Sequence, residues 1–230
     1  MLSQISLTNI IFLDIETVPQ YPGFDDSPEI YKNLWEKKSS FLRKENESAS
    51  DVFNRAGIYA EFGKIICISM GIFDLKDGKK QLRIKSLFGD DEKKILDAFC
   101  HIVNNHPTRK NLLLCAHNGK EFDFPYIARR MLINGIKLPE ILDLAGKKPW
   151  EINLLDTMEL WKFGDYKHYT SLELLASVFD IPSPKDDIDG SMVAHTYWVD
   201  KELDRIAKYC EKDVITIAGI FFEIPGRKII

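Results

Sequence analysis

The order of hydrophobic patterns along the chain restricts its fold more than any other feature. Short apolar runs rich in β-branched residues come first, strand and helix patterns then alternate, and helical patterns dominate the last third. The expected strands cover 8–16, 64–75, 81–88 and 112–116, and the expected helices cover 91–104, 124–134, 170–178 and 200–222. This order predicts a single α/β domain with a mixed central sheet flanked by helices.

Turn and cap residues indicate where several of these elements begin and end. The segment 76–79 is a hairpin signal between the second and third strands. Gly135 is a typical stop after the helix over 124–134. The sequence Thr170-Ser171-Leu172-Glu173 is typical of a capping box, and it predicts a helix that reaches Val178.

Residues 28–57 interrupt this pattern with a polar stretch of mixed charge. Pro28 follows Ser27, a combination typical of a helix start, whereas residues 45–48 are the least helical part. We therefore expect a helical, partly mobile insertion within one domain that spans residues 1–230.

Composition excludes several classes of protein. A chain of 230 residues with 45% hydrophobic residues can bury one sizeable core. No apolar run approaches ~20 residues, and the N-terminus lacks a signal-peptide pattern, so we expect no membrane segment and a cytoplasmic location. The four scattered cysteines are expected to be buried free thiols in a reducing compartment. The net charge of −4 argues against a general polyanion-coating protein, but not against an enzyme that holds one nucleic-acid end.

Asp14 and Glu16 lie at the end of the first expected strand. Residues two apart in a strand point to the same face, so both carboxylates project together while Ile15 enters the core. Neighbouring carboxylates repel each other, and a divalent cation bound by oxygens supplies the missing counter-charge. A solvated strand end followed by a turn explains the same residues equally well.

A second acidic position, Asp123, follows the strand expected over 112–116 and opens a helix. Taken alone, Asp123 is better explained as an N-cap, and Asn118 and Gly119 as ordinary turn residues. His117 has no matching pair of ligands, so we do not expect a zinc site there. Asp156 has the pattern of a helix cap and is interpreted as structural.

The third segment, Tyr209-Cys210-Glu211-Lys212-Asp213, lies within the last expected helix. Tyr209 and Asp213 are four residues apart and therefore share one helix face. Asp is a poor helix former, so its occurrence at position 213 within a helix indicates a functional or structural role for the side chain. Salt bridging to Lys208 or Lys212 is the structural alternative.

Together, Asp14, Glu16, Asp123 and Asp213 resemble the acidic set of the DEDD superfamily of 3′–5′ exonucleases. The form Tyr209-x-x-x-Asp213 is similar to the tyrosine subgroup, because the histidine subgroup carries its histidine where this chain has Lys208. The resemblance implies a ribonuclease H-like fold.

Three further segments narrow the resemblance to the predicted bacterial exonucleases related to the proofreading domain of family B DNA polymerases. These segments are Phe62-Gly63-Lys64-Ile65-Ile66-Cys67-Ile68-Ser69, His117-Asn118-Gly119 before Phe122-Asp123-Phe124-Pro125, and Lys185-Asp186-Asp187-Ile188-Asp189-Gly190-Ser191. The resemblance covers about residues 9–222, and we expect a free-standing exonuclease domain without a polymerase domain.

The resemblance implies a site that holds two Mg²⁺ ions, with Mn²⁺ as a substitute, on Asp14, Glu16, Asp123 and Asp213. Such ions can clamp both oxygens of an in-line displacement at phosphorus. Tyr209 would orient the attacking water, since a phenol is a weak base at neutral pH. The residues expected to contact the substrate are Ile15, Thr17, Asn118, Phe122 and Lys185. For Phe122 a core role is nearly as well supported, and for Lys185 a solvated side chain is the better-supported alternative.

The sequence therefore predicts a metal-dependent 3′–5′ exonuclease that releases nucleoside monophosphates, with single-stranded DNA as the first substrate. RNA remains possible, because recognition of a 2′-hydroxyl depends on details of the groove. The alternatives are an exoribonuclease and a non-catalytic nucleic-acid-binding module on the same fold.

Overall fold

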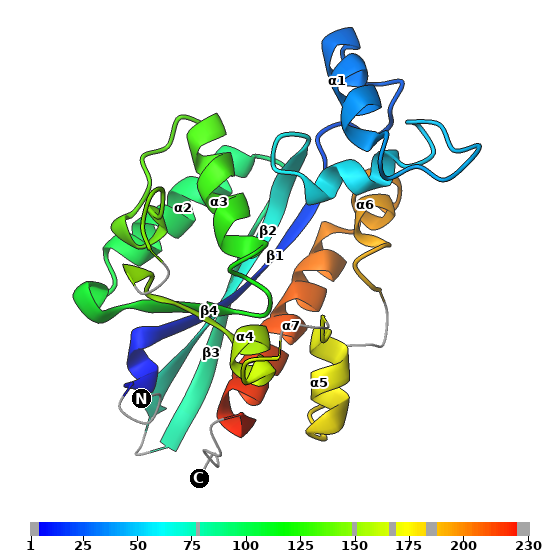
Figure 1. The fold of residues 1–230 in the computed structure, drawn as a ribbon. Helices are drawn as coiled ribbons and strands as arrows, with labels where there is room; N and C mark the ends of the chain where they lie inside the picture. Colours follow the sequence, from blue (N-terminus) through cyan, green and yellow to red (C-terminus); the bar gives the residue numbers. More distant parts are fainter. Residues whose placement is uncertain (1–4, 77–78, 149–150, 166–168, 183–187, 225–230) are drawn as a thin grey trace.

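The computed structural model describes residues 5–76, 79–148, 151–165, 169–182 and 188–224. Its core is a five-stranded mixed sheet with the strand order β3-β2-β1-β4-β5 (Figure 1). β1, β2 and β3 pair antiparallel, whereas β4 and β5 run parallel to β1. The strands are β1 (Ile10–Pro19), β2 (Gly63–Lys76), β3 (Lys79–Phe88), β4 (Leu113–Ala116) and β5 (Leu154–Asp156).

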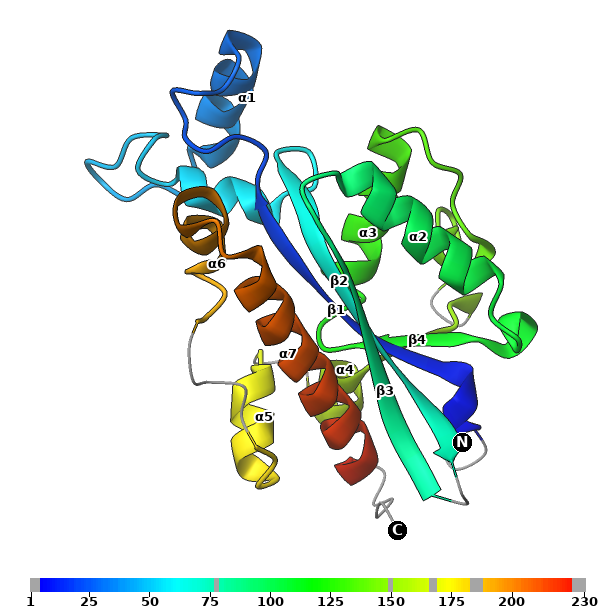
Figure 2. The ribbon, with the colours of Figure 1, turned by 180° about the vertical axis from the view of Figure 1, so that it is seen from behind.

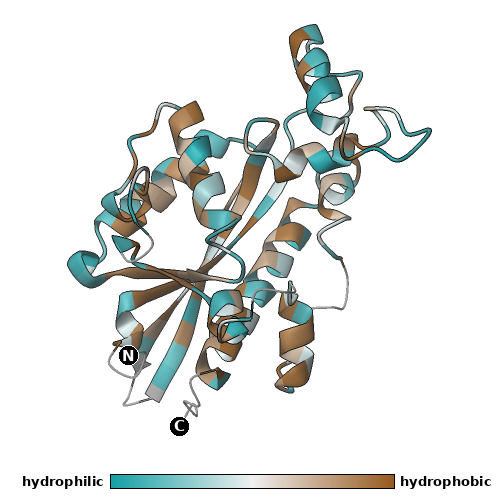
Figure 3. Cartoon of the chain, in the orientation of Figure 1, coloured by the Kyte–Doolittle hydropathy of each residue, from teal (hydrophilic) through white to brown (hydrophobic). Residues whose placement is uncertain are grey.

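Helices cover both faces of this sheet. α2 (Glu92–Asn104) and α3 (Asp123–Ile133) pack on one face, and α7 (Leu203–Glu223) packs across the other, with α5 (Leu172–Val178) against α7 (Figures 1 and 2). The strands are apolar along much of their length (Figure 3). The alternation of β1 explains this layering. Ile11, Leu13 and Ile15 enter the core beside α2 and α3, and Ile10 and Phe12 enter the core beside α7.

The remaining helices are short. They are α1 (Glu29–Ser39), α4 (Thr157–Lys162), α6 (Val193–His195), the 3₁₀ turns η2 (Leu7–Asn9), η3 (Phe53–Ile58), η4 (Arg109–Asn111) and η5 (Glu140–Leu142), and the π turn η7 (Thr196–Asp200). No helix in the part of the chain that the structure describes is both long and apolar enough to cross a membrane.

The predicted architecture is confirmed, but the prediction that the first strand ends at Glu16 is wrong. β1 continues through Pro19, because its residues pair with β2 as far as Gly63. Asp14 and Glu16 therefore lie within the strand rather than at its end. They are nevertheless open on one side, since β1 pairs with β4 only from Ile10 to Phe12.

The expected insertion is helical only near its two ends. α1 covers Glu29–Ser39 and η3 covers Phe53–Ile58, while 40–52 forms turns and loop. Trp35 anchors this excursion, because its buried indole donates a hydrogen bond of 2.9 Å to the carbonyl of Ala49. The aromatic side chains of this segment pack against one another in a separate hydrophobic cluster. α1 projects beyond the end of β1 (Figure 1).

Two predicted helix starts also differ. Ser171, not Thr170, caps α5, and its hydroxyl accepts a hydrogen bond from the amide of Leu174. The last helix begins at Leu203 instead of Asp200, because η7 ends with Lys201 in the left-handed conformation. Such a break interrupts the α-helical ladder.

Candidate active site

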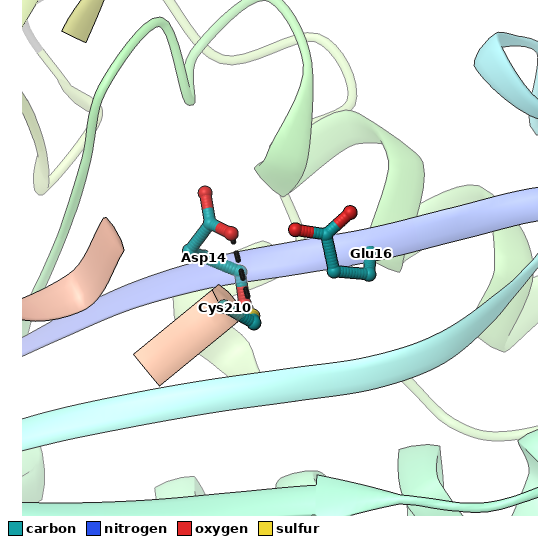
Figure 4. Close-up of side chains that lie close together, drawn as sticks. All are labelled: Asp14, Glu16 and Cys210. Atoms are coloured by element: carbon teal, nitrogen blue, oxygen red, sulfur yellow. Dashed lines mark hydrogen bonds between the residues drawn. The ribbon is translucent and has the colours of Figure 1, made fainter. Parts of the chain in front are cut away.

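Asp14 and Glu16 project from β1 toward the face that α7 covers, as the spacing of two predicts (Figure 4). Ile15 between them is buried in the opposite core. Beyond Phe12 the neighbouring strand β4 no longer pairs with β1. The two carboxylates therefore lie where the sheet leaves space for side chains from other elements.

Cys210 joins these two carboxylates from α7. Its thiol donates to the Asp14 carboxylate, with Sγ 3.3 Å from Oδ2, and lies 3.4 Å from the Asp14 carbonyl oxygen. One potential ligand atom from each of Asp14, Glu16 and Cys210 lies within 4.8 Å of the other two. From the sequence, Cys210 is expected only to be a buried free thiol. Its position between Tyr209 and Asp213 was the available signal.

Asp213 and Tyr209 occupy the same stretch of α7, as predicted. The Tyr209 hydroxyl hydrogen-bonds the Asp213 carboxylate, which is only 8% exposed. Burial raises the pKa of Asp213 to about 7, although the hydrogen bond from Tyr209 opposes the shift. Burial, followed by the charges of Asp213, Glu16 and Asp14, raises the pKa of Tyr209 above its ordinary value. The phenol is therefore protonated near neutral pH.

Asp123 enters the site as the first residue of α3. Phe122 is the N-cap, so the interpretation of Asp123 as a cap is wrong. The Asp123 side chain is 4% exposed, and burial raises its pKa to about 7. Hydrogen bonds to the backbone at Asp123 and Ile15 partly offset that shift in pKa. These contacts aim the carboxylate at the part of β1 that carries Asp14 and Glu16.

The four carboxylates interact electrostatically. The pKa of Asp14 is raised first by burial and then by the charges of Asp213, Asp123 and Glu16. Burial, Asp213, Cys67 and Asp123 likewise raise the pKa of Glu16. Asp123 and Asp213 lie outside the group of atoms within 4.8 Å formed by Asp14, Glu16 and Cys210. Among the described residues, none forms an ion pair with these four acids. The site thus concentrates acidic groups without a paired cation from those residues.

Asn118 lies in a tight turn that precedes Asp123 and α3. Asn118 has a φ of 59°, and its amide N–H donates a hydrogen bond of 2.9 Å to Asp156. Asp156 also caps α4, as predicted, and accepts from the amide of Lys120. Gly119 is required because a Cβ there would clash with the side chain of Ala116. The Asn118 side-chain oxygen Oδ1 is buried and has no hydrogen-bond partner in the described structure.

The other predicted substrate contacts differ in how accessible they are. Thr17 is half-buried and hydrogen-bonds Tyr126. Phe122 is half-buried and packs beside Tyr126, which supports its core role. Lys185 lies outside the described residues.

Tyr169 is a further residue near the site, and no sequence pattern around it indicates a functional role. Its side chain is 66% exposed, and partial burial, followed by the charges of Asp123 and Asp156, raises the pKa of this tyrosine. The carbonyl of the next residue, Thr170, lies 2.8 Å from Nε2 of His117 and ties this segment to the Asn118 turn. Tyr169 is therefore an exposed ring close to the acidic group.

Comparison with known proteins agrees with this geometry. Residues 58–224 match the family model described as "Predicted 3′–5′ exonuclease related to the exonuclease domain of PolB". No curated protein matches the chain.

The fold is also similar to that of solved structures. The family B DNA polymerase from the hyperthermophilic archaeon Pyrobaculum calidifontis superposes with a TM-score of 0.58 at 16% identity. The match covers 94% of this chain and 24% of the polymerase chain. At this identity the likeness concerns the fold alone.

Proposed function

This chain belongs to the family of predicted 3′–5′ exonucleases related to the exonuclease domain of PolB, and from that premise we propose a specific activity. The protein is a metal-dependent nuclease that hydrolyses phosphodiester bonds from the 3′ end of single-stranded DNA. Its products are nucleoside monophosphates.

The observation that carries this proposal is the gathering of Asp14, Glu16, Asp123 and Asp213 with raised pKa values. Buried carboxylates that raise one another's pKa lack a counter-charge, and divalent cations supply one. The donors are hard oxygens, so the residues present fit Mg²⁺, or Mn²⁺ in its place. These four side chains would hold two ions.

Bound ions of this kind neutralise phosphate charge and make hydroxide available at neutral pH. The chain itself supplies positioning. The protonated Tyr209 hydroxyl lies beside Asp213 and can hydrogen-bond a water molecule without removing its proton. Asn118 offers a buried carbonyl oxygen that can accept a hydrogen bond from a hydroxyl of the terminal nucleotide. Thr17 and the backbone of Ile15, which hydrogen-bonds Asp123, would also contact the terminal nucleotide. Tyr169 offers a ring on which a base can stack.

The test is release of labelled mononucleotides from oligonucleotides with free 3′ ends, in Mg²⁺, in Mn²⁺ and in a chelator. We expect stepwise shortening from the 3′ end that needs the metal and is faster on single-stranded DNA than on RNA. Faster cleavage of RNA would identify an exoribonuclease instead.

Matched variants separate chemistry from folding. Asp213→Asn should reduce turnover by orders of magnitude, whereas Asp97→Asn, at an exposed site on α2, should leave turnover unchanged. Binding of DNA without metal-dependent cleavage would identify a non-catalytic module. Cleavage that persists in Asp213→Asn would contradict the assignment of the acidic group.

A further inference from the structure

A pocket with cationic and aromatic walls lies beside the end of β1, outside the acidic group. Its volume is about 500 Å³. It lies where η7 meets the end of β1 and the start of β2, next to α6 (Figure 1). Its walls are Lys64, Asp90, Tyr197, Trp198, Lys201 and Leu203.

The indole ring of Trp198 is the common contact of two lysines in this pocket. Its Nε1 donates a hydrogen bond of 3.1 Å to the carbonyl of Pro19, which holds the ring against β1. The ammonium of Lys64 lies 4.7 Å from the ring centroid, and that of Lys201 lies 5.2 Å from it. Proteins bind single-stranded nucleic acid with this combination, because bases stack on the ring and phosphates are attracted by the cations.

The two lysines differ in how they are held. The ammonium of Lys64 donates a hydrogen bond of 2.9 Å to the Tyr197 hydroxyl, which in turn donates to Asp90 at 2.7 Å. Lys201 is exposed, and its ammonium forms no hydrogen bond or ion pair with any residue that the structure describes. Lys201 therefore has a charge available for an anion that enters the pocket.

The two cations also repel each other. Burial lowers the pKa of Lys64 from its ordinary value. The charges of Asp90 and Glu92 oppose that shift in pKa, and the charge of Lys201 adds to it. A phosphate that contacts both lysines would remove this repulsion.

The backbone brings Lys201 to the ring in a conformation that lysine rarely adopts. Lys201 ends the π turn with a φ of 60°, in the left-handed region that favours glycine. Glycine would adopt this φ at lower cost, so the turn itself does not require a lysine. π turns are rare, and they occur frequently at functional sites.

The pocket lies on the same side of the sheet as the acidic group. Val18, Trp198 and Tyr209 belong to one hydrophobic cluster. Lys64 pairs with Val18, which is two residues along β1 from Glu16. At ~3.3 Å per residue this separation is about 7 Å. A strand whose 3′ end lies at the acidic group therefore reaches the pocket within a few nucleotides.

We propose that this pocket holds a nucleotide upstream of the 3′ end of the substrate strand, with its base on Trp198 and its phosphate on Lys64 and Lys201. The inference rests on the proposed function and adds the direction of the strand, which leaves the acidic group along β1 toward Pro19. Lys201 moves from the ring to the phosphate when the base stacks. Because stacking and phosphate contacts do not read base edges, the pocket does not select a sequence.

The first test is photocrosslinking of the wild-type protein in a chelator, where no cleavage is required. Single-stranded oligonucleotides carry one 5-bromodeoxyuridine at successive positions from the 3′ end, and mass spectrometry identifies the crosslinked residue. We expect Trp198 to be crosslinked from an internal position and not from the 3′-terminal one. Absence of a crosslink at Trp198, or a crosslink from the terminal nucleotide, would overturn the proposal.

Lys201→Gln measures the phosphate contact at an exposed side chain. In a chelator, its affinity for a deoxythymidine oligonucleotide of about ten nucleotides should fall about fivefold. The slope of log Kd against log salt should decrease by about 0.7, the value for one phosphate contact on a single strand. Lys110→Gln, at an exposed position in η4, makes the same change in charge and should alter neither quantity. Equal effects in the two variants would mean that net charge, and not this pocket, attracts the strand.

Kinetics separate this inference from the proposed function. In Mg²⁺ the wild type should have a lower KM for the long oligonucleotide than for a dinucleotide, and Lys201→Gln should reduce that difference. The same difference in Lys201→Gln and in the wild type would refute the pocket and leave the nuclease proposal standing. A protein that crosslinks through Trp198 but cleaves nothing would refute the nuclease proposal and leave the nucleotide pocket standing.

Discussion

Arg130 and Glu92 form a buried, two-pronged ion pair that fixes α3 against α2. Nε of Arg130 donates to Oε1 of Glu92 at 2.8 Å, and Nη2 donates to Oε2 at 2.5 Å. Glu92 also accepts a hydrogen bond from the amide of Ile65 on β2. Because α3 begins with Asp123, this pair holds the helix that carries one of the four acids.

Removing one partner should therefore be costly. Arg130→Met leaves the Glu92 carboxylate buried and unpaired, and we expect a loss of about 3–5 kcal/mol in the free energy of unfolding. Arg83→Met, which removes the exposed pair with Asp74, should cost less than about 1 kcal/mol. Urea denaturation of both variants gives the comparison. Equal losses would mean that the buried pair does not hold α3.

The acidic site should make stability depend on pH. The pKa values of Asp123 and Asp213 are raised from 3.8 to about 7, so the folded protein binds these protons more tightly than the unfolded chain. The stability of the metal-free protein should therefore fall as the pH rises from about 4 to about 7.

The variant Asp123→Asn isolates this effect. It should melt at a higher temperature than the wild type at about pH 8, and the difference should shrink toward about pH 4. Thermal unfolding in a chelator measures the melting temperatures of the variant and the wild type at both pH values. Asp97→Asn serves as the control at an exposed position. A lower melting temperature for Asp123→Asn at about pH 8 would show that the carboxylate is stabilising without metal.

Tyr209→Phe tests the role of the phenol. The change removes a hydroxyl that hydrogen-bonds Asp213 but keeps the ring packed against its cluster. Loss of one positioning hydrogen bond costs about 2–4 kcal/mol at the transition state, which corresponds to a roughly 30- to 1000-fold lower single-turnover rate.

Metal affinity should be unchanged in Tyr209→Phe, because a protonated phenol is not a ligand. Single-turnover cleavage and calorimetric Mn²⁺ binding distinguish the possibilities. An unchanged rate would eliminate the water-positioning role, and a lost metal site would mean that the phenol is itself a ligand.

Asn118→Gly tests whether the side-chain oxygen of Asn118 contacts the substrate. Glycine tolerates the φ of 59°, so the change removes the amide group without adding backbone strain. Loss of one neutral hydrogen bond to the nucleotide should raise KM about 2- to 10-fold. Asn46→Gly is the matched control, because Asn46 is exposed in the loop after α1 and has a φ of 76°. Identical KM values for the two variants would remove Asn118 from the substrate site.

The layers of the fold and the local geometry of the acids follow from residue patterns within single elements. A period of two places Asp14 and Glu16 on one face of β1, and a spacing of four places Tyr209 and Asp213 on one face of α7. Both are properties of a single element, so they can be derived from residue spacing alone.

How these elements meet depends on contacts between residues far apart in the chain. Asp14 and Cys210 are 196 residues apart in sequence, and Asn118 and Asp156 are 38 apart. The extent of β1 depends on its pairing with β2 through Pro19 and on the end of its pairing with β4 at Phe12. Strand register and helix docking depend on burial summed over the whole core. For that reason the local pattern identified the four carboxylates, whereas the thiol beside them emerged only when α7 was packed against β1.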